Sequence, residues 1–532
     1  MTIWLSNSLI YLSLVALTST CVRSIFNLKD LLSNLDWVKR ENRLLKKYLN
    51  KSVNEKYIIC IPMLREQRVI KETIKYFSKM DYPKDKYKIV IVTTNKEVVE
   101  KEKNKGDLKK LAKDLSRQIS VKNLMERYLK LFPKDVLGKV YKKYSGKEFN
   151  VVYKVIKKKY ENLPTTHDLA ILNAKSINSL YKTKLISVIN YPHIEGVMSH
   201  QINYAVDELA KEEGNADSIF AVYNADSRPN LNTLRYVSYA LKKFKDQTGV
   251  IPNLVQQSSL FTLNYQNYPN TIHGYILKAA GLFQTKWTLA KELTRFRSQS
   301  KNVIRVKDTF LSKLINTKIS HCVGHGLFVR FNVLSREYLP TETINEDLPF
   351  GYYQCCKGEP ILPLPVLENS EMPDTFKSLM NQKQIWFTPY LQYLSCRKRV
   401  LTNKKYRSRL EVDILTSQAI TTGVVWLIQS AVLFIPLLIG VIFLNLPIIL
   451  LWIVSILIYW FIPIGVIYRN LDELEEIAGR SLSKINFVDY VFSSLTGLFI
   501  LATHSFGPIL CVRDFAYLGL FGKAITKAKT ER

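Results

Sequence analysis

The chain has 532 residues and is strongly basic, with 76 Lys and Arg against 45 Asp and Glu and a formal net charge of +31. Long apolar segments near both ends exclude a purely soluble protein, and the charged part between them is large enough for one or two domains. Seven cysteines without a C-x-x-C pair fit a reducing compartment and show no zinc-binding spacing.

The first apolar segment, Ile3–Val22, has no Lys or Arg before it. It therefore lacks the positively charged start of a secretory signal, and we expect it to remain as a membrane anchor. Basic residues follow it (Arg23, Lys29, Lys39, Arg40). By the positive-inside rule they place the downstream side in the cytosol.

Three further apolar segments lie near the C-terminus. Thr421–Leu444 and Pro447–Tyr468 are each long enough to cross a hydrocarbon core of about 30 Å, and the break between them predicts a hairpin. Tyr490–Val512 is interrupted by His504 and a Gly-Pro pair, so it is either a kinked span or a re-entrant element. We expect the basic tail, 521–532, inside the cell. The sequence thus predicts a multi-pass protein of the plasma or inner membrane with a cytosolic catalytic domain.

The high positive charge has two interpretations. Such a balance often indicates nucleic-acid binding, but a protein that lies against anionic lipid needs the same charge. One basic cluster, in the segment 396–420, comes directly before the membrane hairpin, where a lipid surface accounts for it. With no nucleic-acid motif in the sequence, we expect the membrane as partner and no nucleic acid.

The central part begins with a strand–helix–strand pattern. Tyr57–Pro62 and Tyr87–Thr94 are short apolar runs, and Gln67–Met80 between them carries apolar residues at helical spacing. Such a unit forms a parallel pair of strands, and ligands bind beyond the carboxyl ends of the strands in open α/β sheets. Those ends are Pro62 to Glu66 and Thr93 to Lys96.

A lysine-rich stretch, about 97–161, then predicts an inserted helical subdomain with a solvated basic face. Strand patterns return at Leu185–Asn190 and Ile219–Tyr223, with a helix from about His200 to Lys211 between them. Val250–Leu263 reads as strand and loop, and a helix is predicted over Ile272–Arg297. The fold class is therefore α/β with additional transmembrane helices.

Polar motifs recur in a fixed order along this part of the chain. The apolar run ending at Tyr223 breaks into Asn224-Ala225-Asp226, a pattern that taken alone is as often a turn cap as a site. It is preceded by Pro62-Met63-Leu64-Arg65-Glu66 and by Gly196–Ala205, and followed by Gly324-His325-Gly326 and Asn345-Glu346-Asp347-Leu348.

This order resembles the family 2 glycosyltransferases of the membrane-anchored processive type, the cellulose, hyaluronan and poly-N-acetylglucosamine synthase-like enzymes. The resemblance runs from about Tyr57 to Tyr390. It implies a GT-A domain, a Rossmann-like nucleotide-diphospho-sugar transferase fold, joined to transmembrane helices. It also implies inverting, metal-dependent sugar transfer in polysaccharide biosynthesis.

For the donor site, the resemblance implies Pro62 and Glu66 in the first-strand turn beside the nucleotide, with Arg65 where Asn is usual. Asn203 matches the Asn of a G-K-x-x-A-L-N segment whose lysine is missing here. Asn95 and Glu97 follow the second strand, where relatives hold the uracil or ribose. Asp226 and Asn224 match the D-x-D that binds Mg²⁺ or Mn²⁺ and the diphosphate, although an amide replaces the first carboxylate.

For catalysis, Glu346-Asp347 matches the family's T/E-D pair, whose Asp is the general base that deprotonates the acceptor hydroxyl. Gln382 and Trp386 match part of the acceptor-lining Q-x-x-R-W motif, with Ile385 in place of the Arg. Trp386 stacks on a sugar in this interpretation and belongs to an interfacial aromatic belt in the alternative one. His325 belongs to a loop near the acceptor, and its alternative is a hydrogen-bonded structural role.

The expected organisation has six parts: an N-terminal transmembrane anchor (1–23), an amphipathic juxtamembrane linker (24–56), a GT-A domain (57–395), a basic interfacial segment (396–420), a transmembrane region (421–520) and a basic tail (521–532). The expected function is transfer of a sugar from a nucleotide sugar, UDP-sugar by family default, to a lipid-linked or growing polysaccharide acceptor. Alternatives are a polyprenyl-phosphate sugar transferase and a non-catalytic scaffold on a degenerate GT-A domain. A basic nucleic-acid binder, suggested by charge alone, ranks last.

Overall fold

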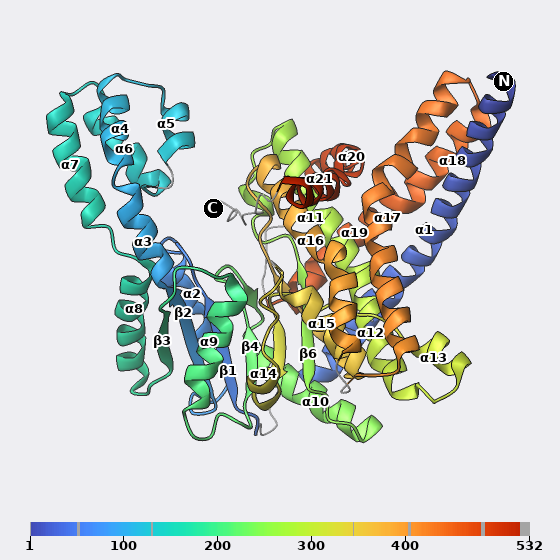
Figure 1. Cartoon of the computed structure of the whole chain (residues 1–532), viewed down its shortest axis with the longest axis horizontal. Coiled ribbons are helices and arrows are strands. Elements are labelled where there is room, and N and C mark those ends of the chain that lie inside the picture. The colour runs from blue at the N-terminus through green and yellow to red at the C-terminus, as the bar shows by residue number, and fades with distance from the viewer. Residues whose placement is uncertain are drawn as a thin grey trace. The chain divides into compact units, whose positions relative to one another are not determined.

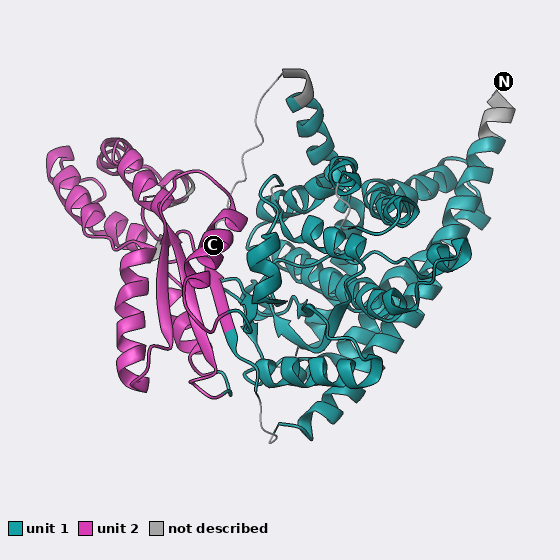
Figure 2. Cartoon of the chain, turned by 60° about the horizontal axis from the view of Figure 1, so that its bottom comes forward, with its two compact units in different colours: residues 1–57, 80–82, 216–532 teal, residues 58–79, 83–215 magenta. Residues whose placement is uncertain are grey.

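The computed structural model describes residues 2–49, 54–128, 131–343, 345–402, 406–479 and 485–521. Figure 2 shows its two compact units: unit 1 comprises residues 1–57, 80–82 and 216–532, and unit 2 comprises residues 58–79 and 83–215. The predicted basic tail from residue 522 onward, and Lys404 and Lys405 of the predicted basic segment, lie outside the described residues.

Unit 2 contains a sheet with the strand order β3-β2-β1. Its strands are β1 (Tyr57–Pro62), β2 (Tyr87–Thr94) and β3 (Ile186–Tyr191), and its flanking helices are α2 (Ile70–Phe77), α8 (Thr166–Tyr181) and α9 (Met198–Ala210). β2 and β3 are parallel, with Ile89 opposite Ile186. The first two strands have the predicted bounds, because continuous apolar runs are typical of strands buried on both faces.

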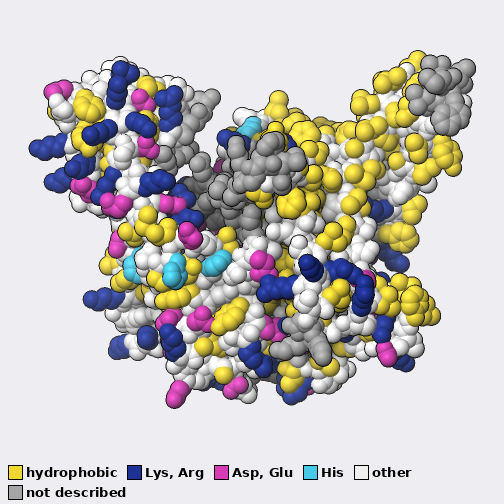
Figure 3. All heavy atoms as spheres, in the orientation of Figure 1, with side chains coloured by type: hydrophobic (Ala, Val, Ile, Leu, Met, Phe, Trp, Pro, Cys, Tyr) yellow, Lys and Arg dark blue, Asp and Glu magenta, His cyan; other side chains and the backbone are white. Residues whose placement is uncertain are grey.

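The lysine-rich segment of unit 2 is helical, as predicted (Figure 1). It forms α3 (Asn95–Asn104), α4 (Asp107–Ser116), α5 (Val121–Tyr128), α6 (Lys134–Tyr144) and α7 (Phe149–Glu161). Leu111, Leu115, Val152 and Ile156 belong to a buried core of these helices. Lys and Arg side chains gather on their surface (Figure 3), so the basic face is the solvated side of a small folded bundle.

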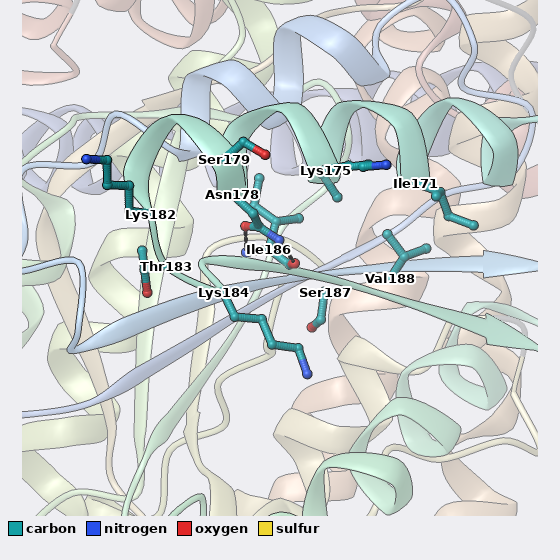
Figure 4. Close-up of a pocket in the computed structure, with 11 residues that line it drawn as sticks. Ile171, Lys175, Asn178, Ser179, Lys182, Thr183, Lys184, Ile186, Ser187 and Val188 are labelled. Atoms are coloured by element: carbon teal, nitrogen blue, oxygen red, sulfur yellow. Dashed lines mark hydrogen bonds between the residues drawn. The ribbon is translucent and has the colours of Figure 1, made fainter.

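A groove on unit 2 runs between α8 and β3 (Figure 4). Inside it, Asn178 donates to the carbonyl oxygen of Ile186 and accepts from the Ile186 N–H, both at 2.8 Å. Asn178 thus attaches α8 to the backbone of β3 through two hydrogen bonds. None of the site residues predicted from the sequence lines this groove.

Unit 1 contains a mixed sheet with the strand order β4-β7-β6-β8-β5. Its strands are β4 (Ile219–Val222), β5 (Arg228–Pro229), β6 (Leu254–Leu260), β7 (Leu327–Arg330) and β8 (Ile361–Asn369). β7 is antiparallel to both β4 and β6, whereas β8 is parallel to β6. The sequence predicted β4 and β6 but not β7 and β8.

Helices of unit 1 pack around this sheet. They are α10 (Thr233–Thr248), α11 (Ile272–Trp287), the π turn η2 (Thr288–Glu292), α12 (Leu293–Asn302), α13 (Phe310–Asn316), α14 (Phe331–Glu337), α15 (Asp347–Lys357) and α16 (Phe376–Leu401), with short 3-10 turns η1 (Tyr265–Asn267) and η3 (Val303–Arg305). The predicted helix over Ile272–Arg297 is therefore one helical stretch in which a π turn joins α11 to α12.

The remaining helices carry the apolar segments. They are α1 (Thr2–Lys46), α17 (Arg409–Ile442), α18 (Leu446–Ile456), the π turn η4 (Leu457–Phe461), α19 (Ile462–Ile477), α20 (Phe487–Thr503) and α21 (Phe506–Phe521). Within the described ranges, four helical stretches are long and apolar enough to cross a membrane: Asn7–Lys46, Arg409–Ile442, Leu446–Ile477 and Phe487–Leu518. Hydrophobic side chains cover the surface that α1, α17 and α18 form in Figure 3. These stretches indicate membrane association and, together with the strands and flanking helices of the two units, confirm an α/β fold with membrane-type helices.

Two details differ from the simplest sequence interpretation. The predicted anchor Ile3–Val22 is the first half of α1, which continues to Lys46 because no Gly or Pro interrupts it. The last apolar segment is broken between α20 and α21 at His504 and Ser505, where the sequence placed its interruption. Two turns before this break, Gly497 of α20 permits close packing, since a Cβ at this position would clash with the ring of buried Trp460 in η4.

Candidate functional site

The turn after β4 holds the first two candidate side chains of unit 1. The N–H of Asn224 donates to Ser227 Oγ at 3.2 Å, and the N–H of Ser227 donates to the carbonyl oxygen of Asn224 at 3.1 Å. Asp226 is buried at 8% exposure and Asn224 is half-buried. The turn therefore fixes one carboxylate and one amide close together at the end of a strand.

A buried glutamate links this turn to the glycine-flanked histidine. Glu368 of β8 is fully buried and accepts hydrogen bonds from Ser259 Oγ (3.0 Å) and Ser227 Oγ (3.4 Å). It also forms an ion pair with His325 Nδ1. Burial alone would lower the pKa of His325, but the carboxylates of Glu368, Glu292 and Asp226 raise it to about 9. The imidazole is therefore protonated at neutral pH.

The loop that carries His325 is held by two glutamines of β6. Gln256 accepts from the N–H of Val323 at 3.0 Å and donates to the carbonyl oxygen of His325 at 2.9 Å. Gly326 adopts a φ of +63° against Gln257, where a Cβ would lie 2.8 Å from the Gln257 Cβ. The backbone thus keeps the imidazole beside Glu368.

The Glu346-Asp347 pair lies at the start of α15. Glu346 is buried at 3% exposure, whereas Asp347 is only half-buried. The preceding loop is attached to α16, because Asn345 Nδ2 donates to the carbonyl oxygen of Ile385 at 2.8 Å. A carboxylate in the first turn of a helix is stabilised in its charged form by the helix dipole. Of the pair, Asp347 is the one that a ligand can reach.

A second buried glutamate lies at the π turn between α11 and α12. Such turns are frequent at functional sites. Burial raises the pKa of Glu292, His325 and Arg295 oppose this rise, and Asp347 reinforces it. The pKa of His325 is thus influenced by Glu292 and Asp226, and the pKa of Glu292 by His325 and Asp347, although these residues come from four separate parts of the sequence. We call Asp226, Glu292, His325, Asp347 and Glu368 the acidic network.

Sequence reasoning missed Glu292 and Glu368. The signal for Glu368 was a glutamate within the apolar run Ile361–Asn369, since acidic residues are almost never fully buried unless paired. For Glu292 there was no such signal, because it lies in a stretch where polar and apolar residues mix as on an ordinary helix surface (Leu289-Ala290-Lys291-Glu292-Leu293-Thr294-Arg295).

Metal binding can be judged from the donor set. Among the described residues there is no group of three His, Cys, Asp or Glu side chains that could hold a metal ion. Asp226 and Asn224 offer two oxygen ligands on one turn, and Mg²⁺ is commonly bound by one or two carboxylates together with phosphate oxygens and water. The residues therefore fit a divalent ion that shares its coordination with a diphosphate, and they do not form an all-protein cage.

In unit 2, the residues predicted to contact the nucleotide cluster where β1 and β2 end. Pro62 ends β1, Glu66 lies in the following turn, and Asn95 and Glu97 begin α3. Asn95 donates to the carbonyl oxygen of Pro192 (3.0 Å) and accepts from Asn190 Nδ2 (2.7 Å). The structure thus brings the ends of β2 and β3 together around Asn95.

Glu97 has a structural task that the sequence did not reveal. Its carboxylate accepts from the N–H groups of Arg65 (3.0 Å) and Thr166 (2.9 Å) and from Gln67 Nε2 (2.6 Å). It therefore joins the turn after β1 to the start of α8. Arg65 itself has a φ of +56°, a left-handed conformation in which Asn is several-fold enriched among non-glycine residues.

The remaining predicted contacts lie on helices. Asn203 is half-buried on α9 of unit 2. Gln382 and Trp386 lie one turn apart on α16 of unit 1, where Trp386 packs partly buried against the core. Lys383 between them is buried at 5% exposure.

No family model and no curated protein matches the chain. Among solved structures, it is similar to the mannosyltransferase PcManGT from Pyrobaculum calidifontis in complex with GDP-Man and Mn²⁺, with a TM-score of 0.35, 11% identity and coverage of 94% of this chain and 99% of the other. It is also similar to S. aureus TarS 1–349 in complex with UDP-GlcNAc, with a TM-score of 0.33, 12% identity and coverage of 83% and 90%. These TM-scores are low, and the assignment of function therefore depends on the residues of this chain.

Proposed function

We propose that this protein is a membrane-bound, inverting glycosyltransferase of the GT-A type, which moves a sugar from a nucleotide-diphosphate sugar to a lipid-linked or growing glycan acceptor. The observation that carries this proposal is the acidic network of unit 1. Ser227, next to Asp226, donates to Glu368 at 3.4 Å, and Glu368 forms an ion pair with His325. Asp347, about 120 residues later in the chain, raises the pKa of Glu292, and His325 lowers it. This arrangement supports the proposal, because the motifs that carry the resemblance come from separate parts of the sequence.

Asp347 is proposed as the general base. Its carboxylate is half-buried and lies at a helix start that favours the charged form. It takes the proton from an acceptor hydroxyl while the hydroxyl oxygen attacks the anomeric carbon of the donor. The bond from that carbon to the diphosphate oxygen breaks, the diphosphate leaves with the electron pair, and attack from the opposite face inverts the anomeric configuration.

Asp226 and Asn224 are proposed to hold the donor diphosphate together with Mg²⁺ or Mn²⁺. A divalent ion in this place supplies positive charge that stabilises the leaving diphosphate. Protonated His325 adds a fixed positive charge close to the same turn, because Glu368 and Asp226 both favour its charged form. A site with that charge accepts an anion better than a purely acidic one does.

Pro62, Glu66, Asn95, Glu97 and Asn203 of unit 2 stay proposed nucleotide contacts, and Gln382 and Trp386 of unit 1 stay proposed acceptor contacts. Glu97 already accepts three hydrogen bonds from its own unit. We therefore expect its substitution to loosen the turn after β1 as well as to weaken nucleotide binding.

The test is nucleotide release by the full-length protein in lipid, measured with UDP- and GDP-sugars, with Mn²⁺ or Mg²⁺ and after chelation. The matched variants are Asp347→Asn and, as a control, Asp374→Asn, which changes an exposed carboxylate of the same unit. We expect metal-dependent release from at least one donor, lost in Asp347→Asn and kept in Asp374→Asn. Absence of both release and nucleotide-sugar binding in the unmodified protein would contradict the proposal and favour the scaffold alternative.

A further inference from the structure

Two lysines of unit 1 are buried among apolar helices. Lys286 of α11 is 7% exposed and Lys383 of α16 is 5% exposed. Lysine is almost never fully buried unless it is paired. Lys286 Nζ donates to the carbonyl oxygen of Tyr459 at 2.8 Å and lies 3.6 Å from the centre of the Tyr459 ring. For Lys383 Nζ, no described residue serves as hydrogen-bond acceptor.

Both lysines and a histidine surround one phenylalanine ring. The centre of the Phe283 ring lies 5.3 Å from Lys286 Nζ, 6.0 Å from Lys383 Nζ and 4.6 Å from the ring centre of His504. His504 also stacks on Trp426, and its Nδ1 has no hydrogen-bond partner within the described ranges. We call Lys286, Lys383 and His504 the Phe283 cluster. It gathers three basic groups in aromatic surroundings.

A neighbouring lysine shows how this chain satisfies a buried ammonium group by itself. Lys278 lies two turns before Lys286 on α11 and is 1% exposed. It forms an ion pair with Asp489 at 3.0 Å and donates to Asn270 Oδ1 at 2.9 Å. In the described part of the chain, neither lysine of the Phe283 cluster has such a carboxylate. The cluster therefore lacks the counter-charge that Lys278 has.

An unpaired ammonium group in an apolar interior is strongly unfavourable. Burial accordingly lowers the pKa of Lys286 and of Lys383 to about 7. An anion bound between them would favour the charged forms and give each ammonium group the acceptors that it needs.

The helices around the Phe283 cluster indicate which kind of anion fits it. A Cβ at Gly507 of α21 would lie 2.6 Å from Lys383 Cβ, so Lys383 packs directly on a helix of the last membrane-type stretch. Tyr459 belongs to the π turn inside another such stretch. A ligand whose charged group meets the lysines and whose apolar part meets these helices is an amphiphile.

We propose that the Phe283 cluster binds the phosphate or diphosphate group of a membrane lipid, and that this lipid carries the hydroxyl group that accepts the sugar. The second part rests on the proposed function. It is supported by α16, on which Lys383 lies two residues before Ile385, the residue whose carbonyl oxygen holds Asn345 beside Asp347. The cluster and the loop of the proposed base are thus both attached to the same turn of α16.

The test measures lipid binding to the full-length protein in a phosphate-free detergent, without any sugar donor. The probes are a short polyprenyl phosphate, the matching polyprenol and inorganic phosphate. We expect the phosphorylated lipid to bind about tenfold or more tightly than the alcohol, because charge-assisted hydrogen bonds are lost with the phosphate. Lys383→Met and Lys286→Met should each remove most of this preference. The control Lys377→Met changes an exposed lysine of α16, the helix of Lys383, and should keep the preference.

Equal binding of polyprenyl phosphate and polyprenol, or an unchanged preference in Lys383→Met, would overturn the proposal. Inorganic phosphate that binds as tightly as the lipid would assign the cluster to a free anion instead and overturn the lipid assignment. If thermal unfolding shows that a variant is not folded, the affinities of the unmodified protein for the three probes still test the proposal. The binding test is separate from the nucleotide-release test of the proposed function. If the protein binds the lipid but releases no nucleotide in that other test, the transferase proposal fails and the lipid site remains.

Discussion

Unit 1 contains two buried regions of opposite charge that differ in how their charges are neutralised. In the acidic network, His325 forms an ion pair with Glu368, and serine hydroxyl groups donate to the same carboxylate. In the Phe283 cluster, Lys383 has neither a carboxylate nor any other acceptor among the described residues. In the first region the positive charge is paired with a carboxylate of the protein, and such pairing fixes geometry. The second is complete only with an anion, and such incompleteness indicates a ligand.

The largest effect is expected at the acidic network. Asp347→Asn keeps the shape of the side chain but removes the proton acceptor, so turnover should fall by about 10²–10⁴-fold. The thermal unfolding midpoint should change little, because Asp347 is only half-buried. Initial rates of nucleotide release and a thermal scan test both points. Full activity of this variant would remove Asp347 from the mechanism.

Asp226→Asn should have the next largest effect. It leaves two amides and no carboxylate on the turn after β4, so the affinity for Mg²⁺ or Mn²⁺ together with the donor should decrease and turnover fall by about a hundredfold. Titration of the metal at a fixed donor concentration measures this. Excess metal should restore part of the rate, and an unchanged metal dependence would place the ion elsewhere.

At the Phe283 cluster, Lys383→Met should act on the acceptor alone. We expect the KM for a phosphorylated lipid acceptor to rise by about tenfold, while donor hydrolysis by water keeps its rate. Thermal stability should stay the same or increase, since replacement of a buried charge by an apolar side chain is often neutral or stabilising. An equal loss in both reactions would show that the lysine shapes the fold of the site.

The smallest effect, and one on stability, is expected from the ion pair of His325 with Glu368. The pKa of His325 is raised to about 9, so its stabilising contribution is present in full below about pH 6.5 and is lost as the pH rises through 9. Thermal midpoints between pH 6 and 10 should therefore decrease toward high pH by an amount that corresponds to roughly 1–3 kcal/mol. In His325→Gln this slope should flatten, and an unchanged slope would assign it to other groups.

Much of the fold could be predicted where local sequence alone determines it. β1 and β2 have the predicted bounds because each is a continuous apolar run closed by polar or Pro-containing sequence. The helices of the basic insertion could be predicted from the helical spacing of their apolar residues. β7 and β8 could not be predicted in the same way, because Leu327–Arg330 is very short and Ile361–Asn369 contains two prolines and a glutamate.

The candidate site shows the same difference between residues in local motifs and residues that tertiary packing brings together. Asn224, Asp226, Glu346 and Asp347 were found because their motifs are local. The pairing of Glu368 with His325 could not be predicted, since it depends on where β8 lies in the sheet. The burial of Lys383 was also not visible, because Gln382-Lys383-Gln384 is polar in sequence and is covered only when Gly507 of α21 packs against it.

The central claim is that Asp347 of the acidic network catalyses transfer of a sugar to an acceptor at the membrane. The most direct measurement supplies the protein in lipid with a radiolabelled nucleotide sugar, a divalent metal and a polyprenyl diphosphate that carries a sugar, and counts label extracted into organic solvent. We predict metal-dependent label in the lipid fraction for the unmodified protein and background counts for Asp347→Asn. Equal label with both proteins, or none with any donor that the unmodified protein binds, would contradict the account.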